Sequence, residues 1–186
     1  MRIVGGEFRG RMLATPKSAN IRPTSDRTRE SLFNILTHQY AENLANARVL
    51  DLFSGTGALG IEALSRGAKY CLFVEDSVEG RGLLRENIEA LSLQGRSKVF
   101  RRDATDVGPV GAIEPFDLVF ADPPYNKGLG EKALRAISEN GWLNPGAIVV
   151  LEEAAAAIIS LPAGFETLDT RPYGEAIIRI LRWAKP

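Results

Sequence analysis

The sequence has little of the residues that build disulfides and metal centres. Its 186 residues include one cysteine, Cys71, and one histidine, His38. A single cysteine excludes an intrachain disulfide and a cysteine-cluster zinc site, and a single histidine argues against a histidine-based metal site or catalytic dyad. We therefore expect a functional site without a metal, and we interpret Cys71 as a core residue.

Long apolar runs are missing too. No run approaches the roughly 20 residues that a membrane-spanning helix needs, and the start MRIVGGEFRG has no apolar stretch of the secretory type. Hydrophobic residues make up 45% of the chain and charged residues 25%, which is ordinary for a globular protein. The composition predicts a soluble, cytoplasmic chain with no membrane partner.

The net charge is zero, but the two signs are unevenly distributed. Residues 1–30 hold seven basic and three acidic side chains, a net charge of +4, and the remainder carries −4. A basic segment on an acidic body is typical of proteins that touch a polyanion with one part. We expect a basic arm over residues 1–23 that contacts nucleic acid, followed by a larger domain over 24–186. The candidate phosphate contacts are Arg9, Arg11, Arg22 and Arg27.

From residue 48 onward, strand-like and helix-like segments alternate. The expected strands cover 49–53, 70–74, 98–102, 116–121 and 147–151. The expected helices between them cover 58–65, 129–139 and a segment that begins at Ser77 and ends at Gly95. Strands separated by helices predict an α/β fold with a mainly parallel sheet that is covered on both faces.

Both ends of the chain carry hairpin signals. Gly5-Gly6 predicts a two-residue turn between residues 1–4 and 7–13, and a helix capped by Thr24 or Ser25 follows. Near the other end, 166–170 and 176–183 flank Pro-Tyr-Gly, which is typical of an antiparallel hairpin. We expect a small hairpin-and-helix extension before the sheet and an antiparallel hairpin at its end.

A glycine-rich loop follows the first strand of the alternating region. Residues 55–60 have the G-x-G-x-x-G pattern, and Glu75 lies 20 residues beyond Gly55, a spacing typical of dinucleotide-binding oxidoreductases. Asp51 argues against a dinucleotide, because a carboxylate just before the loop would repel a pyrophosphate. S-adenosylmethionine (SAM) fits better, since it has no phosphate and carries a sulfonium and an ammonium group.

Acidic residues mark the carboxyl ends of four expected strands, the edge at which parallel sheets bind ligands. They are Asp51, Glu75, Asp103 and Asp122. Carboxylates can accept hydrogen bonds from ribose hydroxyls and can pair with an ammonium group. The sequence therefore predicts a SAM site at this edge.

The tetrapeptide Asp122-Pro123-Pro124-Tyr125 follows the strand at 116–121. Its two prolines fix an extended turn. The exocyclic amine of a nucleobase is a poor nucleophile, because its lone pair is delocalised into the ring. The Asp122 carboxylate and the Pro123 carbonyl could accept both N–H bonds, turn the lone pair toward a methyl donor and stabilise the charge that develops on nitrogen. Tyr125 could stack on the base. Asp122, Pro123 and Tyr125 are the expected catalytic residues, and Pro124 and Tyr125 the expected base contacts.

An aspartate at the first position of this motif bears on the choice of base. A carboxylate offers only acceptors. The guanine edge presents N1–H and the N2 amine side by side, whereas the adenine edge pairs its amine with an acceptor at N1. Asp122 therefore favours guanine, although one carboxylate oxygen could also serve an adenine amine.

Together, MRIVGGEFRGR, RPTSDRTRESLFN, DLFSGTGALGIEALSRGA, FVE and DPPY resemble the RsmD family of bacterial small-subunit rRNA guanine-N2 methyltransferases. The resemblance runs from Met1 to the C-terminal hairpin. It implies the Rossmann-like fold of class I SAM-dependent methyltransferases, SAM as methyl donor, and a guanine in a hairpin loop of 16S rRNA as target. It also implies that the substrate is met in a partly assembled small ribosomal subunit.

The resemblance also implies roles for individual residues. Glu75 corresponds to the ribose-binding acid of the family and Asp103 to the acid beside the adenine. The last position of the target-amine motif is Phe in many relatives, and Tyr125 keeps the stacking ring. The expected SAM-binding set is Asp51, Phe53, Ser54, Gly55, Gly57, Glu75, Asp103, Ala104 and Asp122.

Three other functions stay open at this point. An amino-methyltransferase of DNA or of another RNA would use the same chemistry, but DNA enzymes usually carry a recognition domain for which 186 residues leave no space. A non-catalytic RNA-binding module would not need Asp51, Glu75 and the tetrapeptide at residues 122–125. A nicotinamide oxidoreductase would need an acid–base pair, such as Tyr-x-x-x-Lys, that is not evident.

Overall fold

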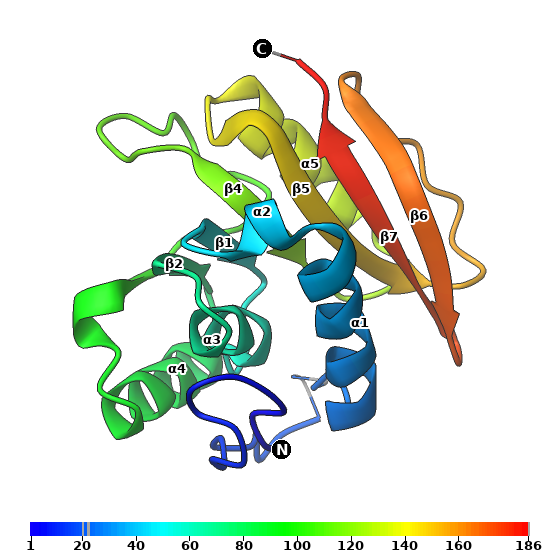
Figure 1. The fold of residues 1–186 in the computed structure, drawn as a ribbon. Coiled ribbons are helices and arrows are strands. Elements are labelled where there is room, and N and C mark those ends of the chain that lie inside the picture. The colour runs from blue at the N-terminus through cyan, green and yellow to red at the C-terminus, as the bar shows by residue number, and fades with distance from the viewer. Residues whose placement is uncertain (20, 22, 186) are drawn as a thin grey trace.

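The protein is built on one sheet, which a computed structural model shows with strand order β3-β2-β1-β4-β5-β7-β6 (Figure 1). The structure describes residues 1–19, 21 and 23–185. The strands are β1 Arg48–Leu52, β2 Tyr70–Val74, β3 Ser97–Phe100, β4 Phe116–Ala121, β5 Leu143–Ala154, β6 Phe165–Tyr173 and β7 Ala176–Trp183. The pairs from β3 to β5 are parallel, and β7 pairs antiparallel with both β5 and β6. The predicted fold class is therefore confirmed.

Helices cover both faces of this sheet (Figure 1). They are α1 Asp26–Gln39, α2 Ala41–Leu44, α3 Ala58–Ser65, α4 Val78–Ala90, the 3-10 turn Gln94–Arg96 and α5 Leu129–Glu139. Apolar residues of α1, α3 and α4 pack on one face of the sheet, and those of α5 pack on the other. Each central strand is thus buried on both sides, which explains its nearly continuous apolar sequence. Among the described residues, no helix combines the length and apolar character that crossing a membrane requires.

Serine caps set the starts of two helices that position the site. The Ser25 Oγ accepts a 3.1 Å hydrogen bond from the Thr28 amide at the start of α1, and the Ser77 Oγ accepts one of 3.0 Å from the Gly80 amide at the start of α4. Both predicted caps are confirmed. The predicted end of α4 at Gly95 is wrong, because the helix already ends at Ala90.

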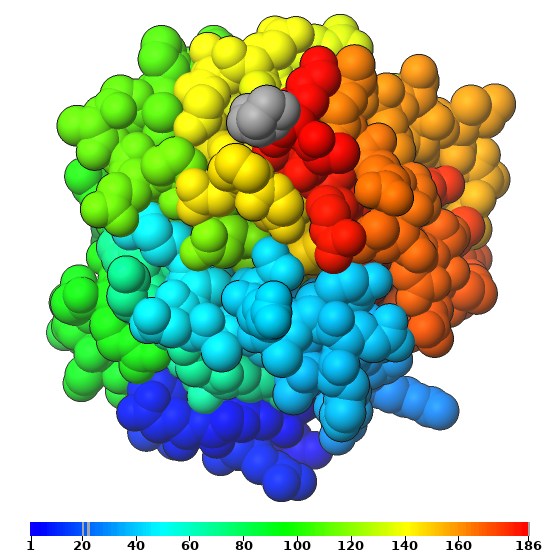
Figure 2. Space-filling model, turned by 45° about the horizontal axis from the view of Figure 1, so that its top comes forward, coloured from blue at the N-terminus to red at the C-terminus, as the bar shows by residue number. Residues whose placement is uncertain are grey.

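The N-terminal segment pairs with itself as predicted, but through a wider turn. Arg2 bridges Met12 in antiparallel fashion, and the Ile3 amide donates to the Arg11 carbonyl at 2.9 Å. Residues 4–10 form the connection, so the predicted two-residue turn at Gly5-Gly6 is wrong. Ile3 and Leu13 are buried in the same core cluster as α1 and α3. In Figure 2 this segment, in dark blue, forms one continuous surface with the segments around it.

The turn is wide because its backbone donors bind α3 instead of the opposite strand. The Val4 and Gly5 amides each donate a 2.9 Å hydrogen bond to the Glu62 carboxylate, and the Glu7 amide donates to the Ser65 carbonyl at 2.7 Å. A Cβ atom at Gly6 would lie 1.9 Å from the Ser65 carbonyl oxygen. Gly6 is therefore required by close contact with α3.

Candidate active site

A cavity of about 830 Å³ opens at the carboxyl edge of the sheet. Most of the sequence-predicted site residues line it, namely Asp51, Phe53, Ser54, Gly55, Glu75, Asp103, Ala104, Asp122, Pro123, Pro124 and Tyr125. Gly57 is not among the lining residues. It has a left-handed φ of +82° before α3, and a Cβ there would lie 2.4 Å from the Leu84 side chain. Its lack of a side chain thus serves helix packing.

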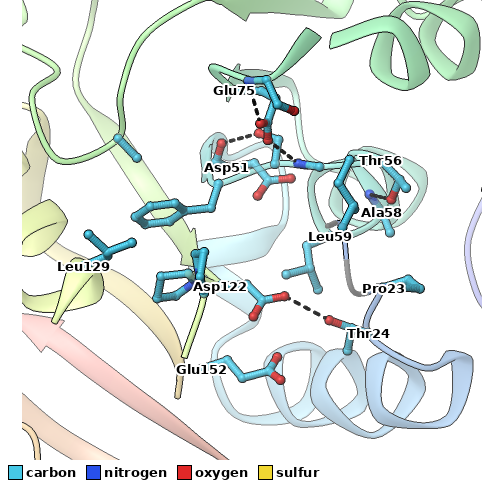
Figure 3. A pocket seen from close by; sticks show the side chains of 18 of the residues that line it. Pro23, Thr24, Asp51, Thr56, Ala58, Leu59, Glu75, Asp122, Leu129 and Glu152 are labelled. Atoms are coloured by element: carbon cyan, nitrogen blue, oxygen red, sulfur yellow. Dashed lines mark hydrogen bonds between the residues drawn. The ribbon is translucent and has the colours of Figure 1, made fainter. Parts of the chain in front are cut away.

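Glu75 fixes the glycine-rich loop at one side of the cavity (Figure 3). One carboxylate oxygen accepts a 2.7 Å hydrogen bond from the Gly55 amide, and the other accepts one of 3.1 Å from the Ser77 amide. Phe53, at the start of the loop, has a φ of +55°, which is strained for a side chain of this size. Glu75 therefore connects the loop after β1 to the start of α4.

Asp51 lies on the floor of the cavity and is almost fully buried. Its Oδ2 accepts a 3.0 Å hydrogen bond from the Gly60 amide in α3. Burial raises the pKa of the Asp51 carboxyl well above its usual range; the hydrogen bond from Gly60 opposes this shift, and the charge of Glu75 adds to it. A cation in the cavity would stabilise the ionised form of Asp51.

The charge of the cavity wall decides which ligands it can take. Eight described lining side chains are acidic: Asp51, Glu75, Asp76, Glu79, Asp103, Asp122, Glu152 and Glu175. The one basic side chain among the described lining residues is Arg102, whose Nη1 donates to the Val107 carbonyl at 2.5 Å. Such a wall repels phosphate and favours a cationic ligand with hydroxyl donors. SAM, which carries positive charge and hydroxyl groups, fits this acidic wall. A dinucleotide, which carries a pyrophosphate, does not.

Asp122 lies at the other side of the cavity, directly after β4. Its Oδ2 accepts a 3.2 Å hydrogen bond from the Thr24 hydroxyl, just before α1 (Figure 3). Burial raises the pKa of the Asp122 carboxyl well above its usual range, and the negative charge of Glu152 raises it further. A ligand that donates hydrogen bonds to the Asp122 carboxylate would oppose this shift.

Glu152, in β5, is a cavity residue that the sequence analysis missed. Its Oε1 accepts a 2.5 Å hydrogen bond from the Tyr125 hydroxyl, and the next residue, Glu153, accepts one of 3.1 Å from the Asn126 amide. The turn after β4 is thus tied to β5. Glu152 follows the expected strand at 147–151, so the acidic strand ends that pointed to Asp51 and Asp122 could also have indicated it.

The described basic residues proposed to contact phosphate, Arg9, Arg11 and Arg27, are not among the residues that line the cavity. Arg9, Arg11 and Arg27 are exposed, and the Arg11 guanidinium also donates to the Ala90 carbonyl at the end of α4 at 3.1 Å. Arg22 lies outside the described residues. Arg29, which contributes to the charge of the first 30 residues, is fully buried and paired with acids. The charge that this segment presents to solvent is therefore smaller than its sequence indicates.

Strand order, the glycine-rich loop after β1 and a cavity at the carboxyl edge define the fold of class I SAM-dependent methyltransferases. A family model described as "Conserved hypothetical protein 95" matches residues 1–182. The chain belongs to this family, which is the RsmD family that the sequence resembles.

Individual relatives cover nearly the whole chain. The "Ribosomal RNA small subunit methyltransferase D" of Escherichia coli (strain K12) is 36% identical over 97% of this chain and 88% of its own length. The protein of the same name from Haemophilus influenzae is 34% identical over 97% of this chain and 92% of its own. The solved structure named "Putative methyltransferase yhhF" from Escherichia coli superposes with a TM-score of 0.82 at 32% identity, covering 99% and 98% of the two chains.

Proposed function

We propose that this chain transfers a methyl group from SAM to the N2 amine of a guanine in 16S rRNA. Its activity would be of the 16S rRNA (guanine 966-N2)-methyltransferase type. One observation carries the proposal: the acidic cofactor side and the Asp122–Tyr125 motif line the same cavity. The names of the relatives support small-subunit rRNA as substrate. Such a substrate implies that the reaction takes place in the cytoplasm. We propose that the rRNA is methylated within a partly assembled small ribosomal subunit.

The cofactor side is assigned to residues whose chemistry suits SAM. The Glu75 carboxylate lies at the end of β2, where it can accept hydrogen bonds from ribose hydroxyls. Asp51 offers negative charge to the ammonium group, and Asp103 and Ala104 face the adenine. The strained loop from Phe53 to Gly55 brings backbone close to the ligand.

The target amine is assigned to the Asp122 side. When bound, SAM would supply an electrophilic methyl carbon: the N2 lone pair forms the N–C bond, the C–S bond breaks with its electrons on sulfur, and the nitrogen then passes its proton to water. The Asp122 carboxylate and the Pro123 carbonyl hold the two N–H bonds, and Asp122 stabilises the positive charge on nitrogen before the proton leaves. The ring of Tyr125 stacks on the base, and Pro124 contacts the edge of the base.

The basic arm is assigned to RNA binding. Arg9, Arg11, Arg22 and Arg27 contact phosphates, which positions the target loop without sequence readout. The acidic cavity repels phosphate, so the base alone enters it, unstacked from its neighbours.

Methylation of defined substrates tests the proposal. Purified protein and labelled SAM are incubated with free 16S rRNA, with small-subunit particles lacking the modification, and with DNA, and the product nucleoside is identified by mass spectrometry. N2-methylguanosine at one position of 16S rRNA is the expected product. Methylated adenine or cytosine, or methylated DNA, would instead support the alternative of another amino-methyltransferase.

A further inference from the structure

Two acidic side chains from different strands meet on the side of the cavity that is assigned to the target base. Asp122 follows β4, and Glu152 belongs to β5. Figure 3 shows both side chains extending in the same direction, toward the start of α1. They are close enough for the charge of Glu152 to raise the pKa of Asp122. The site therefore presents two carboxylates where the proposed function needs one.

No cation of the described chain compensates this pair. The ion pairs formed by its lysines and arginines involve neither carboxylate. The neighbours that donate hydrogen bonds to them are neutral, the Thr24 hydroxyl to Asp122 and the Tyr125 hydroxyl to Glu152. Such a pair is stabilised by a ligand that offers two adjacent hydrogen-bond donors.

Among the bases with an exocyclic amine, guanine has this arrangement. Its N1–H and N2 amine are adjacent donors on one edge. In adenine and in cytosine the ring nitrogen beside the amine is an acceptor, so its lone pair would face a carboxylate lone pair. A polar site discriminates strongly when the wrong ligand leaves a buried group without its partner.

We infer that Glu152 is a specificity-determining residue that accepts the N1–H of the target guanine while Asp122 holds the N2 amine. This inference rests on the proposed function and adds the group that selects the base. It also gives the Tyr125 hydroxyl a role: the hydroxyl holds one oxygen of Glu152 in place, and the carboxylate keeps lone pairs for the base.

The test uses a base that keeps the reacting amine and lacks the N1–H. In 2-aminopurine the amine at position 2 is retained, and N1 is an acceptor. Small-subunit rRNA is prepared with guanine or 2-aminopurine at the target position, free or in reconstituted particles, and kcat/KM is measured for both. We expect the wild-type protein to prefer guanine by about 100-fold or more.

Substitution of Glu152 is expected to remove this preference. In Glu152→Gln the amide can donate to N1 of 2-aminopurine, so the rate with guanine falls, the rate with 2-aminopurine rises, and the ratio drops to about 10 or less. In Glu152→Ala the ratio drops through the loss with guanine alone. Glu166→Gln, at an exposed position of β6 outside the cavity lining, is the matched control and is expected to keep the wild-type ratio.

The outcomes separate this inference from the proposed function. If the wild-type protein methylates guanine and 2-aminopurine equally well, or if both Glu152 variants keep the wild-type ratio, the inference is overturned and the proposed function stands. If the wild-type protein methylates no guanine in the rRNA, the proposed function itself fails. SAM affinity, measured by calorimetry, shows that each variant is folded, and Glu152→Ala decides the question if Glu152→Gln does not fold.

Discussion

The carboxylate of Glu62 on α3 and the guanidinium of Arg29 on α1 meet in the interior, with 3.4 Å between Oε1 and Nη1 and both side chains fully buried. The same carboxylate accepts the Val4 and Gly5 amides, and the same Nη1 donates to the Arg2 carbonyl at 2.9 Å. Burial lowers the pKa of Arg29, and the charges of Asp26 and Glu62 oppose this shift. One ion pair thus docks the N-terminal segment onto two helices.

Removal of Glu62 is expected to destabilise the fold strongly. In Glu62→Ala, Arg29 would be buried without this partner and two backbone donors of the N-terminal segment would be left without their acceptor, so we expect a decrease of about 3–5 kcal/mol in the free energy of unfolding. Urea unfolding followed by circular dichroism measures it. Glu7→Ala is the control, because the Glu7 side chain is 61% exposed in its ion pair with Arg96, and such a pair contributes about 0–1 kcal/mol. Equal effects of the two variants would show that the buried pair does not dock the segment.

Neutralising Asp122 is expected to stabilise the fold at neutral pH. Burial and the charge of Glu152 raise the pKa of this carboxyl in the folded state. A group of this kind contributes stability below its unfolded pKa and loses that contribution as the pH rises through its folded pKa. Asp122→Asn should therefore increase the free energy of unfolding at pH 7 by about 1 kcal/mol, and the gain should shrink toward about pH 4. Urea unfolding at several pH values measures the difference.

A surface substitution of the same kind separates this effect from a general effect of charge. Glu166→Gln, at an exposed position of β6, should change the free energy of unfolding by less than about 0.5 kcal/mol at each pH. An Asp122→Asn variant that is less stable than the wild-type protein at pH 7 would contradict the prediction. It would mean that Thr24 and other donors stabilise the ionised carboxylate more than burial opposes it.

The sheet and most of the cavity could be predicted because their signals are local. Apolar strand segments followed by an acid place Asp51 and Asp122 at one edge in any parallel sheet. Glu152 directly follows the apolar stretch at 147–151, so the same signal was present there, but the sequence gives no sign that β5 continues to Ala154, where it pairs with Ala176 of β7. The apolar pattern of β5 stops earlier, and only this long-range pairing extends the strand past Leu151.

The prediction for the N-terminal turn failed for a related reason, and the same reason explains why Arg29 adds no charge to the surface of the basic segment. Gly5-Gly6 is a hairpin signal when the chain is considered alone, but the amides around it bind Glu62 and Ser65, more than 50 residues away. An arginine is counted as a surface charge by default, and the acids that allow Arg29 to be buried come partly from another helix. Interactions between distant segments decided both outcomes.

Glu75 is expected to contribute directly to SAM affinity. Glu75→Ala should weaken binding by about 1–3 kcal/mol, because it removes a charged acceptor of hydrogen bonds from the ribose and leaves the Gly55 amide without its partner. Glu75→Gln should have a smaller effect, since its amide oxygen still accepts. Titration calorimetry with SAM measures both. Glu86→Ala, at an exposed position of α4, is the control. If a folded Glu75→Ala variant bound SAM as tightly as the Glu86→Ala variant does, Glu75 would not belong to the SAM site.

The basic arm is expected to bind RNA through phosphates. Replacing Arg9, Arg11, Arg22 and Arg27 by alanine should weaken RNA binding and reduce the slope of log affinity against log salt by about 0.7–0.9 for each phosphate that the arm no longer neutralises. SAM affinity should be retained, because the described members of this set do not line the cavity. Fluorescence anisotropy over a salt series measures the slope. Arg135→Ala, exposed on α5 at the opposite face of the sheet, is the single-charge control. An unchanged slope in the fourfold variant would show that the arm does not contact RNA phosphates and serves only solubility.

Asp122 is expected to act on the reaction and not on cofactor affinity. Asp122→Ala should reduce single-turnover methyl transfer by about 100-fold or more, because the charge that it stabilises develops on the target nitrogen only in the transition state. Asp122→Asn should keep part of the rate, since its amide oxygen still accepts one N–H bond. Tyr125→Ala should lose the stacking ring and most of the rate, whereas Tyr125→Phe removes only the hydroxyl that holds Glu152 and should have a smaller effect. Single-turnover assays, with SAM affinity measured in parallel, distinguish these effects. Wild-type turnover in Asp122→Ala would exclude the carboxylate from the mechanism, and equal effects of the two Tyr125 variants would show that the hydroxyl, and not the ring, is what the reaction needs.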